Sequence, residues 1–477
     1  MKYETVVGLE VHAELSTQSK AYCDCKNQFG APVNTLCCPV CMGMPGALPV
    51  LNEKVLDAAI RMGFATHCAI NKVCKQDRKN YFYPDLTKGY QVTQSDVPIC
   101  EGGYLDVMVD QTGATRRFGI TRIHIEEDTG KLIHDDAFDG TLIDFNRCGV
   151  PLIEIVTEPD FRSASDAKAC LEAIRSLLIA LNVSDAKMQE GSIRCDVNVS
   201  VRPEGSDTQG TRVEMKNLNS FSGIGRAIEF ESARQMAVLE SGGSIEHETR
   251  RWDDMKGENF VMRSKEYAHD YRYFPEPDLL TIVVDDAHLA ELRAAMPELP
   301  DQKMRRFMND YKLPYDDAAT LLGDSEKATL FEATVALGSH AKLVSNWLCG
   351  DVARLLGERG VTLAKTKLTD AKLHEMVVLI EAGTISSAVG KTIIERLMFE
   401  DTAAAAVVEA EGLGQISDED ALRELAAKVV GENPKAVEDY KSGKTNVLGF
   451  LVGQCMKQSR GKGNPDLLRR LVEDCLK

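Results

Sequence analysis

The stretch Val7-Gly-Leu-Glu-Val-His-Ala-Glu-Leu15 decides how the first part of this chain folds. Its apolar residues stand at every second position. The residues between them are small or polar: Gly8, Glu10, His12 and Glu14. Successive side chains of a β-strand point to opposite faces, so this period of two predicts a half-buried strand over residues 4–15. One face of the strand belongs to the core, and the other carries Glu10 and His12 side by side.

Four later stretches repeat the alternation, at residues 119–128, 151–158, 192–202 and 211–217. Their polar positions carry mostly charged side chains: Arg122, His124, Glu126, Glu154, Arg194, Asp196, Asn198, Glu214 and Lys216. Any one of these strands alone is typical of the solvated face of an open antiparallel sheet. Together they place carboxylates and histidine at strand centres. We therefore predict a site for a divalent cation such as Mg²⁺, which binds through carboxylates, water and substrate phosphates.

Composition limits the class of protein. The chain has 477 residues, of which 44% are hydrophobic, and this length suits about three domains. It contains no run of about 18 apolar residues, and its start lacks the apolar segment of a signal peptide. We expect a cytoplasmic globular protein with no membrane partner. A net charge of −17 argues against a protein that coats nucleic acid non-specifically, but it is compatible with a local basic patch.

The sequence pattern changes near residue 290. Before it, alternating segments dominate, with helical periodicity over residues 53–67 and 163–181. Ser163 and Asp166 are placed to form a capping box at the start of the second of these helices. After it, nearly every segment has helical periodicity. Glycines separate the predicted helices: Gly323, Gly350, Gly360 and Gly383.

This pattern predicts an α+β fold with three domains. The first, over residues 1–292, has a mainly antiparallel sheet with helices. A helical linker domain follows over residues 293–402, and a helical tail domain over residues 403–477. We find no internal repeat.

The chain has 14 cysteines, and without a leader they are expected to be reduced core residues or metal ligands. Cys23-Asp-Cys25 and Cys38-Pro-Val-Cys41 form two close pairs separated by a short loop. Two such turns can present four thiolates to one tetrahedral Zn²⁺. We therefore predict a structural zinc site within the first domain. The alternative is burial in the core, because C-x-C is a less diagnostic spacing than C-x-x-C.

Two glycine-rich segments imitate nucleotide-binding motifs. Residues 383–392 resemble a phosphate-binding loop, but the glycines are two positions too far apart and a helical pattern precedes them. The segment Gly223-Ile-Gly225 lacks a third glycine and a preceding strand. If this protein uses ATP, it binds the nucleotide without a standard motif.

Longer motifs extend over essentially the whole chain. Besides the opening strand, they are Arg78-Lys-Asn-Tyr-Phe-Tyr-Pro-Asp85, Lys88-Gly-Tyr-Gln91, Asp144-Phe-Asn-Arg147, Arg194-Cys-Asp-Val-Asn198, Glu214-Met-Lys-Asn-Leu-Asn219, Tyr271-Arg-Tyr-Phe-Pro-Glu-Pro-Asp278, Gly449-Phe-Leu-Val-Gly453 and Gly461-Lys-Gly-Asn-Pro465. In these motifs the chain resembles the B subunit of the aspartyl/glutamyl-tRNA(Asn/Gln) amidotransferase. Motifs of this length and number make the resemblance highly specific.

The resemblance implies the kinase and transamidase subunit of a heterotrimeric ligase. Such an enzyme converts Glu-tRNA(Gln) or Asp-tRNA(Asn) to Gln-tRNA(Gln) or Asn-tRNA(Asn). A carboxylate reacts poorly with ammonia, so ATP would first convert it to an acyl phosphate. Phosphoryl transfer depends on positioned charges and Mg²⁺. We therefore expect ATP and Mg²⁺ as cofactors, and the first domain as the catalytic one.

The acidic sheet face and the resemblance together indicate the site residues. The expected ligands of Mg²⁺ are Glu10, His12, Glu126, Glu154 and Asp196. The residues expected near phosphates or the activated carboxylate are Lys79, Lys88, Arg194, Asn198 and Lys216. Histidine is an unusual ligand for Mg²⁺, so we expect Mn²⁺ to substitute readily.

Ammonia must come from a partner protein. The chain has no amidase-type Gly-Ser-Ser-Gly-Gly run, so we expect glutamine hydrolysis on the A subunit, with the small C subunit completing the heterotrimer. The ammonia tunnel of the family implies that Lys88, Tyr90 and Glu126 lie along the delivery path. Two alternatives stay open: a non-catalytic tRNA-binding subunit whose acidic sheet docks a partner, and a free-standing metal hydrolase. The metal hydrolase is the less favoured of the two, because the helical tail would have no purpose in such an enzyme.

The end of the chain carries a local basic excess. From residue 441 onward there are eight basic and three acidic residues. The basic ones are Lys441, Lys444, Lys457, Arg460, Lys462, Arg469, Arg470 and Lys477. Considered by itself, this charge is compatible with a solvated helix face. The resemblance to a tail domain that reads the tRNA elbow favours RNA binding instead.

Overall fold

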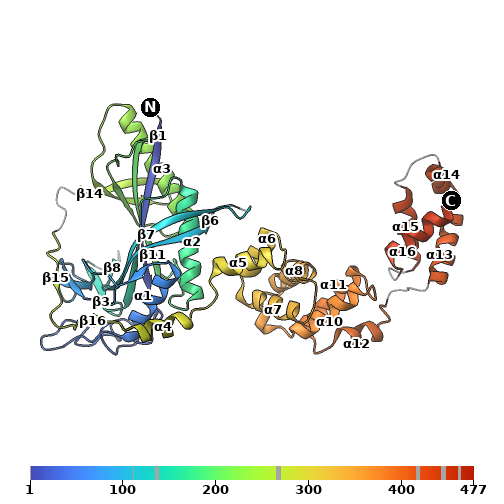
Figure 1. The fold of residues 1–477 in the computed structure, drawn as a ribbon, viewed down its shortest axis with the longest axis horizontal. Helices are drawn as coiled ribbons and strands as arrows, with labels where there is room; N and C mark the ends of the chain where they lie inside the picture. The colour runs from blue at the N-terminus through green and yellow to red at the C-terminus, as the bar shows by residue number, and fades with distance from the viewer. Residues whose placement is uncertain are drawn as a thin grey trace. The chain divides into compact units, whose positions relative to one another are not determined.

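The computed structural model describes residues 2–110, 112–134, 139–264, 270–414, 419–441, 447–459 and 463–476. It divides the chain into two compact units, Met1–Lys303 and Met304–Lys477 (Figure 1). Each unit is described by itself. Within the described ranges, no helix is long and apolar enough to cross a membrane.

The main sheet of the first unit has nine strands. Their bounds are Tyr3–Glu14 (β1), Ala69–Ile70 (β2), Cys100–Met108 (β6), Thr115–Glu127 (β7), Pro151–Thr157 (β10), Ile193–Pro203 (β11), Val213–Lys216 (β12), Glu248–Asp253 (β13) and Glu258–Ser264 (β14). Across the sheet the order is β14-β13-β12-β11-β1-β10-β7-β6-β2. Every neighbouring pair is antiparallel except β12 and β13, which are parallel. The structure therefore confirms the predicted α+β class.

Three helices cover the apolar face of this sheet: α1 (Glu53–Ala65), α2 (Ala164–Ala180) and α3 (Phe221–Glu240) (Figure 1). Val7, Leu9 and Val11 of β1 are buried in one core with apolar side chains of all three helices. Because the side chains of a strand alternate, burying this set turns Glu10 and His12 to the opposite face. The five strands predicted from alternation are present as β1, β7, β10, β11 and β12, each within a few residues of the expected bounds.

The start of α2 shows half of the predicted capping box. The hydroxyl of Ser163 accepts a hydrogen bond from the main-chain amide of Asp166 at 3.1 Å. The carboxylate of Asp166 binds to Arg116 at 2.5 Å instead of reaching back to the cap. The hydroxyl of Ser163 thus caps the first turn of α2, and the carboxylate of Asp166 links this turn to Arg116 of β7.

Smaller sheets complete the first unit. Strands β15 (Phe274–Pro275), β4 (Asp77–Asn80) and β5 (Tyr90–Thr93) form one of them, in that order. Strand β5 packs next to β7 on the polar side of the main sheet, where Gln91 and Thr93 donate hydrogen bonds to Glu126. Two further pairs are β3 (Val73–Cys74) with β16 (Ile282–Val283), and β8 (Lys131–His134) with β9 (Thr141–Asp144). Helix α4 (Asp286–Ala294) packs on α1, and α5 (Pro300–Asn309) begins at the end of the unit.

The second unit is built from helices. They are α6 (Tyr315–Leu322), α7 (Ser325–Ala336), α8 (Ala341–Trp347), α9 (Ala353–Arg359), α10 (Asp370–Glu381), α11 (Ser387–Phe399), α12 (Ala404–Ala410), α13 (Glu419–Glu432), α14 (Pro434–Lys441), α15 (Val447–Gln458) and α16 (Pro465–Leu476), with a 3₁₀ turn at Leu363–Lys365. One core runs from Phe307 to Val407, and a second from Leu422 to Leu476. The domain boundaries at residues 292 and 402 stay predictions.

Glycines mark the ends of helices in this unit at three of the four expected places. Gly323 follows α6, Gly383 lies just after α10, and Gly360 ends α9 with a φ of 61°, a left-handed conformation that glycine adopts easily. The prediction for Gly350 was wrong. That residue lies inside a π-helical turn, Leu348–Val352, which joins α8 to α9 without a break. The segment 383–392 follows α10 and runs through a short turn into the first half of α11, which agrees with discounting it as a phosphate-binding loop.

Candidate functional site

The register of the main sheet aligns polar residues in rows across four strands. His12 on β1 faces Glu154 on β10, and Glu154 faces His124 on β7. Arg194 on β11 lies on the other side of His12 in the same row. Glu126 follows two residues after His124 and therefore shares its face. These strands bring residues from distant parts of the sequence to one place.

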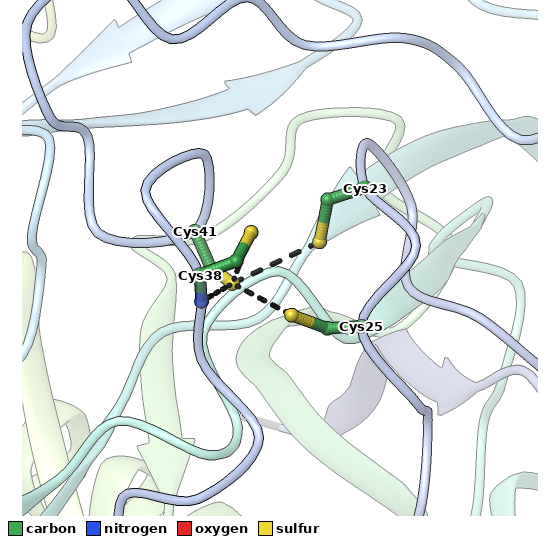
Figure 2. Close-up of side chains that lie close together, drawn as sticks. All are labelled: Cys23, Cys25, Cys38 and Cys41. Atoms are coloured by element: carbon green, nitrogen blue, oxygen red, sulfur yellow. Dashed lines mark hydrogen bonds between the residues drawn. The ribbon is translucent and has the colours of Figure 1, made fainter.

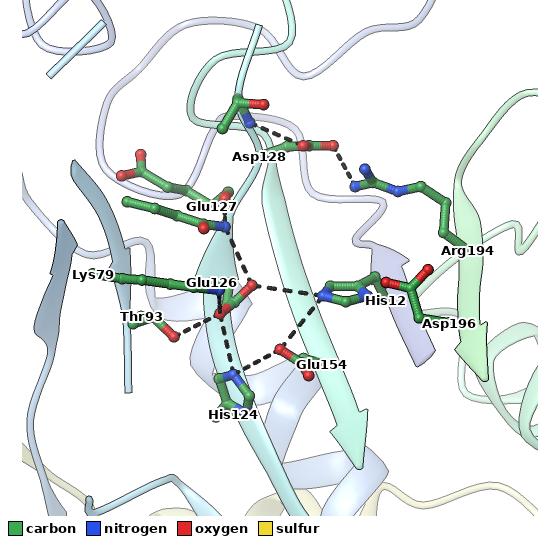
Figure 3. A network of polar contacts seen from close by, with 12 residues as sticks. His12, Lys79, Thr93, His124, Glu126, Glu127, Asp128, Glu154, Arg194 and Asp196 are labelled. Atoms are coloured by element: carbon green, nitrogen blue, oxygen red, sulfur yellow. Dashed lines mark hydrogen bonds and ion pairs between the residues drawn. The ribbon is translucent and has the colours of Figure 1, made fainter. Parts of the chain in front are cut away.

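The first acidic cluster consists of His12, Glu126 and Glu154, whose possible ligand atoms lie within 4.8 Å of one another (Figure 3). We call these three residues the His12 triad. His12 Nε2 is 3.4 Å from Glu154 Oε2 and 3.8 Å from Glu126 Oε2. His124 Nε2 bridges the two carboxylates from the other side, 3.2 Å from Glu126 and 3.1 Å from Glu154.

Several donors hold the buried carboxylate of Glu126. Thr93 Oγ1 donates to Glu126 Oε1 at 2.7 Å and Gln91 Nε2 to Oε2 at 3.2 Å, while Lys79 Nζ lies 3.9 Å from Oε1. Burial raises the pKa of Glu126, but Lys79 and His124 outweigh it and lower that pKa to about 2. The triad therefore keeps an ionised carboxylate in a place that excludes most water.

The charges of the neighbouring groups follow from the same contacts. Burial raises the pKa of Glu154, but the charges of His12 and His124 lower it well below its usual value. Burial lowers the pKa of His124, and Glu154 and Glu126 raise it to about 9. At neutral pH both carboxylates are thus negative and hold a cation between them, here the imidazolium of His124.

A second acidic cluster lies further along β1. It contains Glu10, Asp196 of β11 and Glu214 of β12, whose carboxylate oxygens also lie within 4.8 Å of one another. We call it the Glu10 triad. Lys216 pairs with both Asp196 and Glu214, at 2.5 Å and 3.0 Å. The five expected metal ligands are therefore divided between two clusters, and Glu214 is an additional member.

Asn198 gives the Glu10 triad an unused oxygen. Its Nδ2 donates to Glu10 Oε1 at 2.8 Å. Its Oδ1 is buried and has no hydrogen-bond partner among the described residues. A buried polar atom without a partner is costly, and an amide oxygen beside three carboxylates suits a hard cation. The donors of both triads thus fit Mg²⁺, with the imidazole of His12 as the softer ligand.

Each of the expected phosphate-binding cations faces a carboxylate. Lys79 lies near Glu126, as described above, and Lys88 forms an ion pair with Glu127. Arg194 donates to Asp128 at 2.6 Å (Figure 3). Tyr90 lies next to Lys88, whose Nζ is 5.3 Å from its ring centroid. These contacts place the cations around the acidic face and leave their roles toward phosphates as predictions.

The four cysteines form a compact cluster in the loops after β1 (Figure 2). The sulfur of Cys41 is 3.8 Å from that of Cys23, 3.7 Å from that of Cys25 and 3.5 Å from that of Cys38. Four sulfurs about 2.3 Å from a central zinc would be about 3.8 Å apart. The cluster therefore has the size and composition of a closed structural zinc site.

A buried lysine lies against this cluster. Lys20 is fully buried, and its Nζ donates to the carbonyl oxygens of Cys148 at 2.6 Å and Leu36 at 2.7 Å and lies 3.8 Å from Cys41 Sγ. A hydrogen bond from Cys23 lowers the pKa of Cys41 to about 4, against the effect of burial, and Lys20 adds to the lowering. Buried charges are normally paired, and here the sulfur of Cys41 is the nearest group that can carry the pairing charge.

Comparison with known proteins agrees with the geometry. Residues 5–290 match the model of the GatB/GatE catalytic domain, and residues 329–476 match that of the GatB domain. The chain belongs to the GatB family. The B subunit of the aspartyl/glutamyl-tRNA(Asn/Gln) amidotransferase from Caldicellulosiruptor bescii is 51% identical over 477 residues, which cover 99% of each chain. The proteins of the same name from Clostridium tetani and Moorella thermoacetica are each 48% identical, over 99% and 100% of both chains.

Some residues of this GatB site were not among the expected metal ligands or phosphate-binding residues. His124 and Glu214 stand on the polar faces of predicted strands, so alternation alone could have included them. Gln91 and Thr93 reach Glu126 from a separate small sheet, and Asp128 holds Arg194 from the end of β7. No local pattern in the sequence indicates those contacts.

Proposed function

We propose that this GatB chain uses ATP to activate the side-chain carboxylate of Glu-tRNA(Gln) or Asp-tRNA(Asn) and then amidates it with ammonia. The observation that carries the proposal is the pair of acidic triads on one face of the main sheet. The buried carboxylates of Glu126 and Glu154 are kept ionised, which a surface that only docks a partner does not require. They suit a reaction in which phosphate charges must be positioned.

The two triads would hold Mg²⁺, the Glu10 triad with the free oxygen of Asn198 and the His12 triad through Glu126 and Glu154. When bound, Mg²⁺ supplies charge that offsets the negative phosphate oxygens during transfer. Gln91, Thr93 and His124 keep the two carboxylates of the His12 triad in place. Preorganised groups of this kind need no rearrangement at the moment of reaction.

The cations around the acidic face would bind and orient the reactants. In the first step a carboxylate oxygen of the charged amino acid attacks the γ-phosphorus of ATP, and ADP leaves. In the second step ammonia attacks the carbonyl carbon of the acyl phosphate and phosphate leaves. Lys79 and Arg194 border the His12 triad and would face the negative charge that develops in both steps. Lys88, Tyr90 and Glu126 stay our prediction for the ammonia path.

The name shared by the relatives implies a complex of several subunits. We propose a heterotrimer in the cytoplasm with a glutaminase A subunit and a small C subunit, because the chain lacks an amidase motif. The tail beyond residue 403 would bind tRNA. Of the eight basic residues from residue 441 onward, Lys457, Arg469 and Arg470 are exposed, whereas Lys444, Arg460, Lys462 and Lys477 lie outside the described residues.

We further propose that the cysteine cluster holds a structural zinc ion. All four positions of a tetrahedron are occupied by sulfur, so no position would be left for a substrate. The cluster would therefore fix the loop between β1 and α1 and take no part in the chemistry.

ATP hydrolysis tests the proposed function. The assembled complex should hydrolyse ATP when mischarged tRNA is present, and Glu10→Ala should abolish this hydrolysis. Glu101→Ala is a matched control, because Glu101 is an exposed carboxylate on β6 of the same sheet. A complex that binds charged tRNA without hydrolysing ATP, or a Glu10→Ala variant with full hydrolysis, would contradict the proposal and favour a docking role.

A further inference from the structure

A cavity of about 620 Å³ lies in the first unit, separate from the two triads. It is lined by the loop that follows β1, the first part of α1, the turn after α2 and the end of α4. As far as the structure describes it, this lining includes no residue of either triad. We call it the α1 cavity. Its volume falls within the range of about 300 to 1,000 Å³ that is typical of small-molecule sites.

Arg61 lines this cavity without a counter-ion. Its side chain is half-buried, and its Nε is buried without a hydrogen-bond partner. Within the described ranges, no carboxylate lies at ion-pair distance from its guanidinium. The other half-buried arginines of these ranges all donate to an acceptor, as Arg78 does to Glu276 and Arg175 to the carbonyl oxygen of Ala186. Because a half-buried cation without an acceptor is unfavourable, Arg61 is available to a ligand from outside the chain.

Among the described lining residues, Asp57 is the one with a carboxylate, and that group is already in use. Asp57 is buried and lies one turn before Arg61 on α1. Its Oδ2 accepts a hydrogen bond from Lys54 Nζ at 2.9 Å, and its Oδ1 accepts one from His288 Nε2 of α4 at 2.8 Å. Both oxygens of Asp57 are therefore engaged, and this carboxylate does not neutralise Arg61.

The rest of the lining combines hydrogen-bonding groups with an apolar part. Hydroxyl and amide groups come from Ser16, Gln18 and Asn182. The apolar part consists of Ala58, Val183, Leu292 and Ala295. Inorganic phosphate would contact the polar groups and leave the apolar part unused. The lining therefore suits a molecule with a negatively charged head and a small apolar body.

We propose that the α1 cavity binds a small organic acid, with the carboxylate on the guanidinium of Arg61 and the apolar body against Ala58, Val183 and Leu292. The planar guanidinium offers parallel N–H donors that match the two oxygens of a carboxylate. Removing the apolar body from water adds affinity in proportion to its area. Because the cavity shares no described residue with the triads, this site is separate from the proposed amidation chemistry.

The experiment measures the affinity of the assembled complex for sodium acetate, butanoate and hexanoate by calorimetry at constant ionic strength. Each CH₂ group that the cavity buries should tighten binding by roughly 4-fold. Arg61→Met removes the charge and should weaken hexanoate binding by roughly 10- to 150-fold. Ala295→Leu, at an exposed position, narrows the apolar part and should weaken hexanoate binding more than acetate binding. Lys168→Met is the matched control with unchanged affinities, because it removes one charge from an exposed position on α2 outside the cavity.

Equal affinity for hexanoate and acetate, or for hexanoate and inorganic phosphate, would overturn the proposal, because the site would then recognise charge alone. Unchanged hexanoate affinity in Arg61→Met would overturn it as well. The proposal would also fail if the complex bound none of these acids, and loss of assembly in Arg61→Met would then assign Arg61 to a carboxylate of a partner subunit. The measurement uses no ATP, glutamine or tRNA, so its outcome is independent of the proposed function.

Discussion

At the scale of single residues, the sequence indicates which side chains carry charge but not which ones meet. Glu10 and His12 are two positions apart on one strand, and the prediction joined them in one metal site. The structure assigns them to different clusters, because His12 meets Glu154 of β10 whereas Glu10 meets Asp196 of β11. Alternation gives the face of each residue, while the partner depends on the order of strands, which one sequence does not reveal.

The cysteines behave differently, because their partners are close in sequence. Cys23, Cys25, Cys38 and Cys41 were grouped from spacing alone, and the structure brings the four sulfurs together. Lys20 could not have been foreseen, since its burial beside the cluster depends on a hydrogen bond to the carbonyl oxygen of Cys148, which is 128 residues away in sequence.

The zinc proposal predicts that purified protein contains about one zinc per chain. Cys38→Ser should release the metal and destabilise the first unit, because the binding energy of a structural zinc supports folding. Metal analysis of freshly purified protein checks this. Protein without zinc would reduce the four residues to core cysteines.

A second prediction concerns Lys20. Lys20→Met keeps the volume of the side chain and removes the cation beside the thiolates, so zinc affinity should fall by about 10- to 100-fold. Competition with a chromophoric chelator measures it. Lys26→Met is the control, since Lys26 is exposed on the same loop. Equal zinc affinity in both variants would show that Lys20 does not compensate the thiolate charge.

At the scale of elements, the period of the apolar residues and the helix caps were sufficient to locate most helices and strands. The predicted bounds of α1 and α2 differ from the observed ones by at most two residues at either end. Gly350 was misjudged because glycine ends many helices, yet a π-helical turn accommodates it when the neighbouring side chains Leu348 and Val352 are buried. Tertiary packing decides such cases.

The cap of α2 allows a prediction at this scale. Ser163→Ala removes the hydroxyl that accepts from the Asp166 amide, so the free energy of unfolding should fall by about 1 kcal/mol. Urea unfolding of the protein measures it. Ser176→Ala is the control, because Ser176 is exposed on the same helix and its hydroxyl donates to the carbonyl oxygen of Glu172, away from the cap. Equal effects of both changes would exclude a specific role for the cap.

At the scale of the whole molecule, the two units have separate cores, and the second unit contains two of them. Ala404 and Val407 of α12 belong to the core that begins at Phe307. The helices from α13 onward form the last core. A truncated chain that keeps the preceding core intact should therefore end at residue 414 rather than at residue 403.

Removal of residues 415–477 should weaken binding of mischarged tRNA and reduce amidation. Glutaminase activity and assembly of the complex should stay close to normal, because the proposed tail acts on RNA alone. Binding measured at moderate salt checks this, since phosphate contacts depend on salt. A truncated complex with the affinity of the intact one would assign the tail a structural role or a protein partner.

The central claim is that the His12 triad serves amidation and that ammonia is made on a different chain of the complex. Amidation of mischarged tRNA and hydrolysis of glutamine, measured in the same sample of reconstituted complex, test it most directly. Glu126→Gln, which preserves shape and removes the charge held by Lys79 and His124, should abolish amidation, as should His12→Ala. Glutamine hydrolysis should largely persist in both variants, and Glu101→Gln should retain both activities. Full amidation by Glu126→Gln or His12→Ala would contradict the account.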